Sequence, residues 1–219
     1  ILASMLLPAL AKAKAKANRI KCVNNLASIG KATLGFAAEN TERMPWQLTP
    51  LQQTNHKYGS GGRGANSAAA IVQIASMRSE LQTPKILVSP SDPSRQAANE
   101  TLQQNWKTAP NNVIGAGLSY AFTAAPNNGG DSQRPSTVLA LTSNIRGDLN
   151  SDWTGADETN PPAQAFAGLN KSQGQLVLAD GSAKQSSNAD LGTAGKITKA
   201  HVNSRGGQYK GNASTAVIK

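Results

Sequence analysis

The sequence predicts an α+β protein in which one long amino-terminal helix packs on a small antiparallel β-sheet with long polar loops. The opening segment is dominated by Ala, Leu and Lys and contains no glycine before Gly30, which is typical of a helix. Later apolar runs are short and bounded by turn-forming residues, which favours strands. The 219 residues suit one domain, and 20 Gly, 11 Pro and 4% aromatic residues indicate a loop-rich polar body.

The long helix is predicted over residues 2 to about 38, and its apolar pattern divides it into two halves. From residue 20 onward, apolar and small side chains fall within one sector roughly 120° wide, which forms a stripe that can pack on a folded head. The head-packing stripe comprises Ile20, Val23, Leu26, Ala27, Gly30, Leu34 and Ala37. We therefore expect residues 1–40 to form a helical unit, with 1–19 projecting and 20–38 packed on a head formed by residues 41–219.

The projecting half combines an apolar segment with a row of cations. The apolar segment contains Leu2, Met5, Leu6, Leu7, Pro8 and Leu10, and the basic collar contains Lys12, Lys14, Lys16, Arg19 and Lys21. Pro8 lacks a backbone donor and crowds the preceding turn, so we expect a kink or local melting there. The formal net charge is +10 and the first acid is Glu39, which suits an anionic partner such as nucleic acid, lipid headgroups or an acidic protein surface.

Three interpretations of this arm compete. The first is a solvated surface helix of Ala and Lys, the second is a nucleic-acid-binding arm, and the third is an apolar anchor followed by a basic collar. Alternating Ala and Lys over residues 11–17 favours the second interpretation. The apolar segment that precedes them favours the third, which suits membrane storage followed by polymerisation.

The head is predicted to contain one short helix and several strands. An amphipathic helix is expected over residues 66–81, with Asn66 as its amino-terminal cap. Strands are expected over residues 113–123 and 137–142. Surface loops rich in Gly, Asn, Ser and Pro are expected over residues 55–66, 124–136 and 143–165.

A hairpin is predicted near the carboxy-terminal third of the chain. Residues 176–178 form a short apolar run that is followed by Asp180 and Gly181. These two residue types suit the two positive-φ positions of a type I′ turn. Residues 182–186 then return as a polar strand.

The residues for catalysis are scarce, and we expect the protein not to be an enzyme. The single cysteine, Cys22, excludes an internal disulfide framework and a Cys-rich metal site, and it is interpreted as a small buried apolar residue. His56 and His201 both lie in surroundings rich in Gly, Asn and Ser. No nucleophile elbow, P-loop or dinucleotide-binding glycine motif is present.

One acidic loop suggests a calcium site. Asp148, Asn150 and Asp152 alternate in the way that opens an oxygen-ligand calcium loop. Trp153 and Thr159 stand where an EF-hand requires Gly and Glu, so a polar surface loop is the alternative. Calcium is the one cofactor that the sequence suggests.

The amino-terminal 45 residues resemble the mature start of type IV pilin-like and type II secretion pseudopilin-like proteins with a prepilin-type cleavage/methylation signal. The likeness is greatest to a group common in planctomycete and verrucomicrobial lineages. The matching residues are Leu6-Leu7-Pro8-Ala9-Leu10, Cys22, Asn24-Asn25-Leu26, Ile29-Gly30, Glu39-Asn40 and Pro45. Two later elements extend the resemblance, Ile86–Asp92 and Gln175–Gly181. Ser89 stands where relatives often carry a cysteine that would pair with Cys22, and Asn170 stands where they carry a histidine.

The resemblance implies a pilin-like fold and a structural role. It implies that a leader and about fourteen mature residues precede Ile1. The expected function is that of a subunit in a helical type IV pilus-like filament or type II secretion pseudopilus. Its partners would be copies of itself, the assembly machinery and the bacterial inner membrane, with a periplasmic head before assembly and a periplasmic or extracellular filament afterwards. The alternative is an adhesive or DNA-uptake pilin that binds nucleic acid non-specifically.

Overall fold

The computed structural model describes residues 2–48, 50–56, 67–125, 128–129, 134–203 and 215–219. These residues form an α+β structure with a long amino-terminal helix and a four-stranded antiparallel sheet, as the sequence predicts. The helices are α1 (Leu2–Glu39), α2 (Pro50–Asn55), α3 (Ala68–Gln73), α4 (Ala75–Leu81), α5 (Gln96–Asn105), α6 (Asn111–Ala116) and α7 (Lys196–Asn203). The 3₁₀ turns are η1 (Pro84–Leu87), η2 (Pro93–Arg95) and η3 (Asn188–Asp190).

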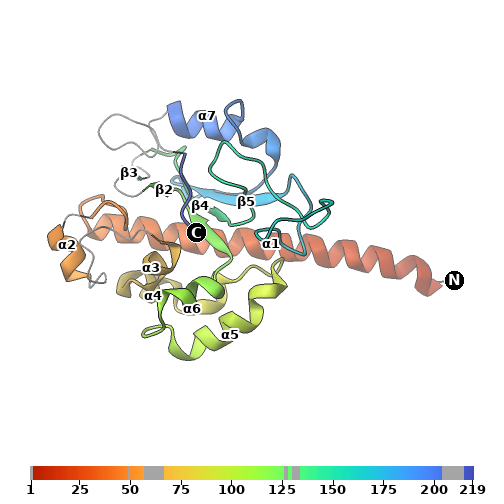
Figure 1. Cartoon of the computed structure of the whole chain (residues 1–219), viewed down its shortest axis with the longest axis horizontal. Coiled ribbons are helices and arrows are strands. Elements are labelled where there is room, and N and C mark those ends of the chain that lie inside the picture. The colour runs from red at the N-terminus through yellow and green to blue at the C-terminus, as the bar shows by residue number, and fades with distance from the viewer. Residues whose placement is uncertain (1, 49, 57–66, 126–127, 130–133, 204–214) are drawn as a thin grey trace.

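The main sheet is the central layer of the head. Its strand order is β1 (Tyr120–Phe122), β4 (Val138–Thr142), β5 (Gly174–Leu178) and β6 (Ala183–Ser186), with every pair antiparallel. A separate pair is formed by β2 (Ala124–Ala125) and β3 (Asn128–Gly129). Figure 1 shows α1 and α3–α6 on one side of the sheet and α7 on the other. β4 and β5 are therefore buried throughout, which explains their continuous apolar runs.

α1 packs directly on the central strands, and a glycine sets how closely it approaches. A Cβ atom at Gly30 would lie 2.6 Å from Cγ2 of Val177 in β5. Only a residue without a side chain fits at that separation unless the valine moves. On its other side α1 contacts α4, so that the packed half of the helix lies between the sheet and the small helices.

The buried face of α1 differs from the head-packing stripe that the sequence predicts. Leu26, Gly30 and Ala37 are buried as expected, but Ile20 is 49% exposed. Val23, Ala27 and Leu34 are half-buried. The other buried residues between 20 and 38 are Cys22, Ile29, Ala32, Thr33 and Phe36. At 100° per residue this face is rotated by about a quarter of a turn from the predicted stripe. The helix is apolar or small around much of its circumference here, so the pattern alone does not select one face.

A second core lies on the opposite face of the sheet, and it anchors the segment predicted as a surface loop over 143–165. Ile145, Leu149 and Trp153 from that segment are at most 1% exposed. They pack with Leu176 of β5 and Ile197 of α7. The segment is irregular along most of its length, but its apolar side chains hold it against the sheet.

The helix predicted over residues 66–81 is two helices. Ile74 has an extended conformation with ψ 139°, which ends α3 and begins α4. The hydroxyl of Ser67 accepts a hydrogen bond from the backbone N–H of Ala70 and so caps α3. Asn66, the predicted cap, lies outside the described residues, as does most of the predicted loop 55–66.

The strand predicted over residues 113–123 begins later than expected. Residues 111–116 form α6, which starts directly after Pro110 and buries Ile114. The Gly117 backbone N–H bonds to carbonyls of the last turn, so the helix ends there and the chain continues into β1. The strand prediction failed because Val113 and Ile114 have a high β propensity that tertiary packing overrides.

The β5–β6 hairpin forms where the sequence predicts it, but its turn is not type I′. Gly181 has φ +82°, whereas Asp180 does not have positive φ. The Gly181 N–H donates to Leu178 O, and the Leu178 N–H donates to Ser182 O. This is a three-residue loop with glycine at the left-handed position. The Asp180 carboxylate accepts bonds from the Ser182 backbone and hydroxyl.

We predict opposite effects for alanine at two glycines of α1. Gly30→Ala should destabilise the protein by about 1–3 kcal/mol, because Val177 must move away from the new methyl group. Gly35→Ala should stabilise it by up to about 1 kcal/mol, since nothing lies within 4 Å of its Cβ position and alanine favours a helix. Chemical denaturation measures both, and equal effects of the two substitutions would contradict this packing.

Candidate functional site

The first half of α1 extends beyond the head, and no described element of the head packs against its projecting part (Figure 1). All described side chains from Leu6 to Ala17 are exposed. Leu6, Leu7 and Leu10 expose 66–67% of their surface. Together with Ala9 and Ala13 they line a shallow, almost wholly apolar hollow of about 600 Å³. The side chains of Leu2 and Met5, which belong to the predicted apolar segment, lie outside the described part.

The helix continues through Pro8 without local melting. Its 38 residues correspond to about 57 Å at 1.5 Å per residue. Within the described residues, no helix has the length and apolar character that a membrane crossing requires. The projecting half is therefore a continuous helix that presents a short apolar surface.

The basic collar follows this apolar surface along the same helix. Lys12, Lys14, Lys16 and Lys21 are exposed, and Arg19 is half-buried. Among the described residues, none of the five forms an ion pair. The Arg19 Nε atom is buried and has no hydrogen-bond partner in the described structure. The collar is thus a concentration of positive charge that the molecule's own described acids do not neutralise.

The junction of the arm with the head is held by amide side chains of α1. The Asn18 Nδ2 group donates to Pro90 O at 3.4 Å. The Asn25 Nδ2 group donates to Val88 O and to the Tyr120 hydroxyl, each at 3.2 Å. These bonds fasten the chain around residues 88–90 along the helix, so the direction of the arm is set by the head.

A buried polar cluster lies directly behind this junction. The Cys22 Sγ atom is hydrogen-bonded to Ser89 Oγ at 2.7 Å, and Ser91 Oγ lies 3.7 Å from the same sulfur. Cys22 is buried, as expected, but it is a hydrogen-bonding member of the cluster. Burial raises the pKa of the Tyr120 hydroxyl well above its ordinary value, and Cys22 raises it further. The structure therefore places position 89 beside Cys22, where the resemblance implies a cysteine pair.

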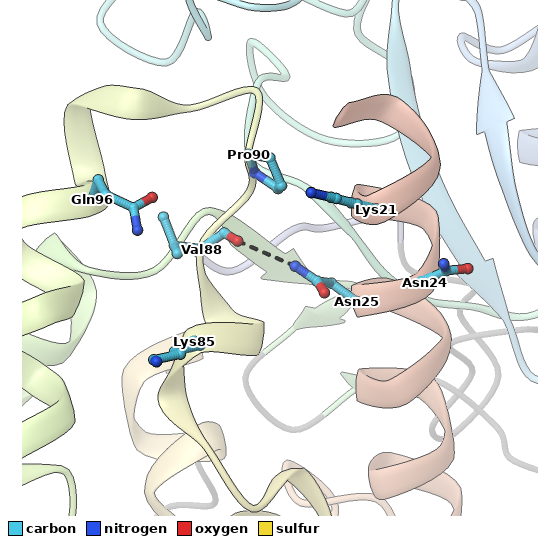
Figure 2. A pocket seen from close by; sticks show the side chains of 7 residues that line it. All are labelled: Lys21, Asn24, Asn25, Lys85, Val88, Pro90 and Gln96. Atoms are coloured by element: carbon cyan, nitrogen blue, oxygen red, sulfur yellow. Dashed lines mark hydrogen bonds between the residues drawn. The ribbon is translucent and has the colours of Figure 1, made fainter. Parts of the chain in front are cut away.

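A cleft opens beside the junction, between α1 and the segment from η1 to α5. Its volume is about 520 Å³. Figure 2 shows it with the Asn25–Val88 hydrogen bond at its wall. The cleft is lined by Lys21, Asn24, Asn25, Lys85, Val88, Pro90 and Gln96. Two ammonium groups and several amides lie around it, and no acid is among these residues, so it favours an anionic group.

The predicted calcium loop is only partly brought together. The Asp148 carboxylate accepts hydrogen bonds from Asn150 and from the Thr215 hydroxyl. Asp152 instead lines a second polar cleft, beside the ion pair of Arg146 and Glu158. In the described part of the chain, no group of three His, Cys, Asp or Glu side chains is placed to hold a metal ion. The calcium site remains a prediction from the sequence.

The two histidines take part in packing. The backbone N–H of Val138 donates to His201 Nδ1 at 3.1 Å, and His201 is fully buried. His56 Nε2 is hydrogen-bonded to Asn40 Oδ1 at 2.7 Å, and its ring lies against Phe36. Asp180 and Gly181 likewise have the structural role of a turn.

Several residues of the junction were not singled out by sequence reasoning. Asn18 and Tyr120 stand in no motif, and their partners are far away in the sequence. Asn25 belongs to the Asn-Asn-Leu motif, which contributes to the family resemblance but by itself indicates no contact for its side chain. Ser89 and Ser91 lie in the Ile86–Asp92 element, in which the resemblance places a cysteine partner for Cys22 at position 89. Long-range hydrogen bonds of this kind need a known fold before they can be recognised.

Comparison with protein-family models, with curated proteins and with solved structures finds no significant match to this chain. Function is therefore inferred from the geometry of α1 and of the residues that hold it to the head. The exposed apolar segment, the basic collar and the cleft at the junction are the three features that require an explanation.

We predict that the head folds without the arm. Deleting residues 1–17 removes no side chain described as buried, so the protein should remain a cooperatively folding monomer with a melting temperature within a few degrees of the full chain. Deleting residues 1–29 also removes Cys22, Leu26 and Ile29 and should abolish folding. Circular dichroism and size-exclusion chromatography measure both. An aggregated product of the shorter deletion would show that the arm belongs to the core.

We also predict that Ser89→Cys forms a disulfide with Cys22. The two side-chain atoms are already 2.7 Å apart and buried. The bond would close a loop with 67 residues of sequence separation, for which chain entropy predicts a gain of roughly 4 kcal/mol. Thiol titration and thermal unfolding with and without reductant measure it. Ser91→Cys, at the longer distance of 3.7 Å from the sulfur, is the matched comparison and should cross-link less completely.

Proposed function

We propose that this protein is the structural subunit of a helical filament, either a type IV pilus-like fibre or a type II secretion pseudopilus. The observation that carries the proposal is the bare apolar segment of the projecting half of α1. Leu6, Leu7 and Leu10 are about two-thirds exposed on a rod that the head does not cover. An apolar surface of this kind is expected to be covered by another molecule.

Copies of the same helix are suitable partners for that surface. At about 25 cal/mol per Å² of apolar surface, a few hundred Å² buried against each neighbour contributes several kcal/mol. One subunit in a helical array has several neighbours, so these contributions accumulate along the filament. Assembly strength should therefore come from the apolar segment.

The basic collar should contribute less to assembly strength. Exposed ion pairs contribute about 0–1 kcal/mol each, and salt weakens them. Packed helices would bring Lys12, Lys14 and Lys16 of several copies close together. Water or acids of neighbouring heads must then offset the repulsion, because the described part of this chain supplies no acid to the collar.

The motif residues behind the resemblance have structural roles that support the proposal. Asn25 fastens the head to α1, and Gly30 allows the helix to approach the sheet. Asn40 donates to Phe36 O and ends the helix. A long helix with a firmly attached head and a free apolar end is the geometry that a filament subunit needs. We propose that the arm resides in the bacterial inner membrane before assembly and that the filament lies in the periplasm or outside the cell.

We predict that replacing Leu6 and Leu7 by glutamine in a complete precursor stops filament formation. Leu51→Gln is the matched control, because Leu51 is 73% exposed but lies on α2 of the head. Neutralising Lys14 and Lys16 to glutamine should leave filaments intact and change their sensitivity to salt. Electron microscopy of material sheared from cells that contain the assembly machinery measures all three. Filaments that survive the Leu6/Leu7 change would overturn the proposal.

A further inference from the structure

We propose that the cleft between Lys21 and Lys85 receives the carboxylate of Glu39 from a second copy of this chain, so that subunits stack with the far end of one head against the base of the next. This inference rests on the proposed filament function. It assigns the contact that sets the axial spacing of the subunits. The cleft is distinct from the apolar segment, which lies more than two helical turns away along α1.

The chemistry of the cleft selects an anion. Lys21 lies on α1 and Lys85 on η1, and neither forms an ion pair with any described residue. Gln96 lines the same cleft and offers an amide donor. Figure 2 shows the two ammonium groups on opposite sides of Val88. A carboxylate in the cleft would therefore gain a charge-assisted hydrogen bond from one of them, about twice as strong as a neutral one, and the other would attract it at longer range.

The cleft is also preorganised. Asn25 is held by Val88 O and by the Tyr120 hydroxyl, so the wall between α1 and residues 88–90 is fixed before any ligand arrives. The buried contact of Cys22 with Ser89 supports that wall from behind. A site with a rigid wall loses little conformational freedom on binding, which favours a specific contact over a diffuse attraction.

Glu39 is the acid whose position fits such a contact. It is exposed on the last turn of α1 and forms no ion pair with a described residue. Eighteen residues of helix separate it from Lys21, which is about 27 Å along the axis, so Glu39 cannot reach the cleft of its own chain. A parallel copy displaced by about that distance brings its Glu39 level with Lys21. The neighbouring cation, Arg43, donates to Gln47 O.

Two other acids are less suitable because they already form ion pairs. Asp92 pairs with Arg95, and Glu158 pairs with Arg146. Glu80 and Glu100 are also exposed, but they lie on α4 and α5. Glu39, in contrast, shares α1 with Lys21, so the axial distance between the two follows from the helix rise. Contacts between two different patches of one molecule generate open helical arrays when the rotation does not close. The Glu39-to-cleft contact is of this type.

The main experiment is a charge exchange in the complete precursor. Lys21→Glu and Glu39→Lys should each raise the concentration needed for assembly by roughly tenfold, which corresponds to about 1.4 kcal/mol. The double variant should restore assembly, because the pair is then reversed but complementary. Glu100→Lys, the matched control on an exposed acid of α5, should have little effect. Assembly is followed by sedimentation and electron microscopy.

A second measurement detects the contact directly. A carbodiimide joins an ammonium group to a carboxylate only when the two touch, and Lys21 and Glu39 of one chain are too far apart. We expect a Lys21–Glu39 or Lys85–Glu39 cross-linked peptide in filaments. In filaments mixed from ¹⁵N-labelled and unlabelled protein, the peptide should contain one labelled and one unlabelled half in the statistical proportion.

The outcomes separate this inference from the proposed function. Filaments that form normally but show neither the reciprocal rescue nor the cross-link overturn the inference and leave the filament proposal standing. The absence of wild-type filaments overturns both. If Lys21→Glu leaves assembly unchanged but abolishes binding of a duplex DNA probe, the cleft serves a phosphate polymer and the inference is wrong.

Discussion

Burial of one face of α1, from Cys22 to Ala37, is the interaction on which the rest of the structure depends. The sheet packs on this face through the close approach of Gly30 to Val177, and α4 packs on the adjoining side. The head covers only this part of the helix. The described side chains before Asn18 are exposed, so the same helix forms part of the core and also an uncovered surface.

The short hydrogen-bonded junction decides how the covered and bare halves relate to each other. Asn25 ties the helix to Val88 and Tyr120, and Cys22 contacts Ser89 within a buried cluster. Breaking one member would leave a buried polar group unsatisfied, which costs about 1–3 kcal/mol. The arm is therefore held in one direction relative to the head, and the cleft beside it keeps its shape. Such a fixed direction suits the filament that we propose, in which every subunit would make the same contacts.

Residue propensities and apolar patterns predicted the elements for which the local signals agree. The long helix, β4 and the β5–β6 hairpin were predicted because composition, apolar runs and a glycine turn signal agreed. These local rules failed where tertiary contacts override the conformational preference of the residues. Val113 and Ile114 favour a strand but form α6 under a covering core, and Ile74 interrupts a predicted single helix. Ile145, Leu149 and Trp153 looked like isolated residues of a polar loop, yet a second core binds them.

The sequence by itself determined that a long helix exists, that its first half is apolar and then cationic, and that its second half can pack. These properties follow from residue type and helical period, which are local. Only the tertiary structure decided which face of α1 is buried, because that choice depends on the shape of the surface that meets it. It also decided that Lys21 and Lys85, 64 positions apart in the sequence, line one cleft. Such a site is formed by segments that are distant in the sequence and come together only on folding, so no local sequence pattern predicts it.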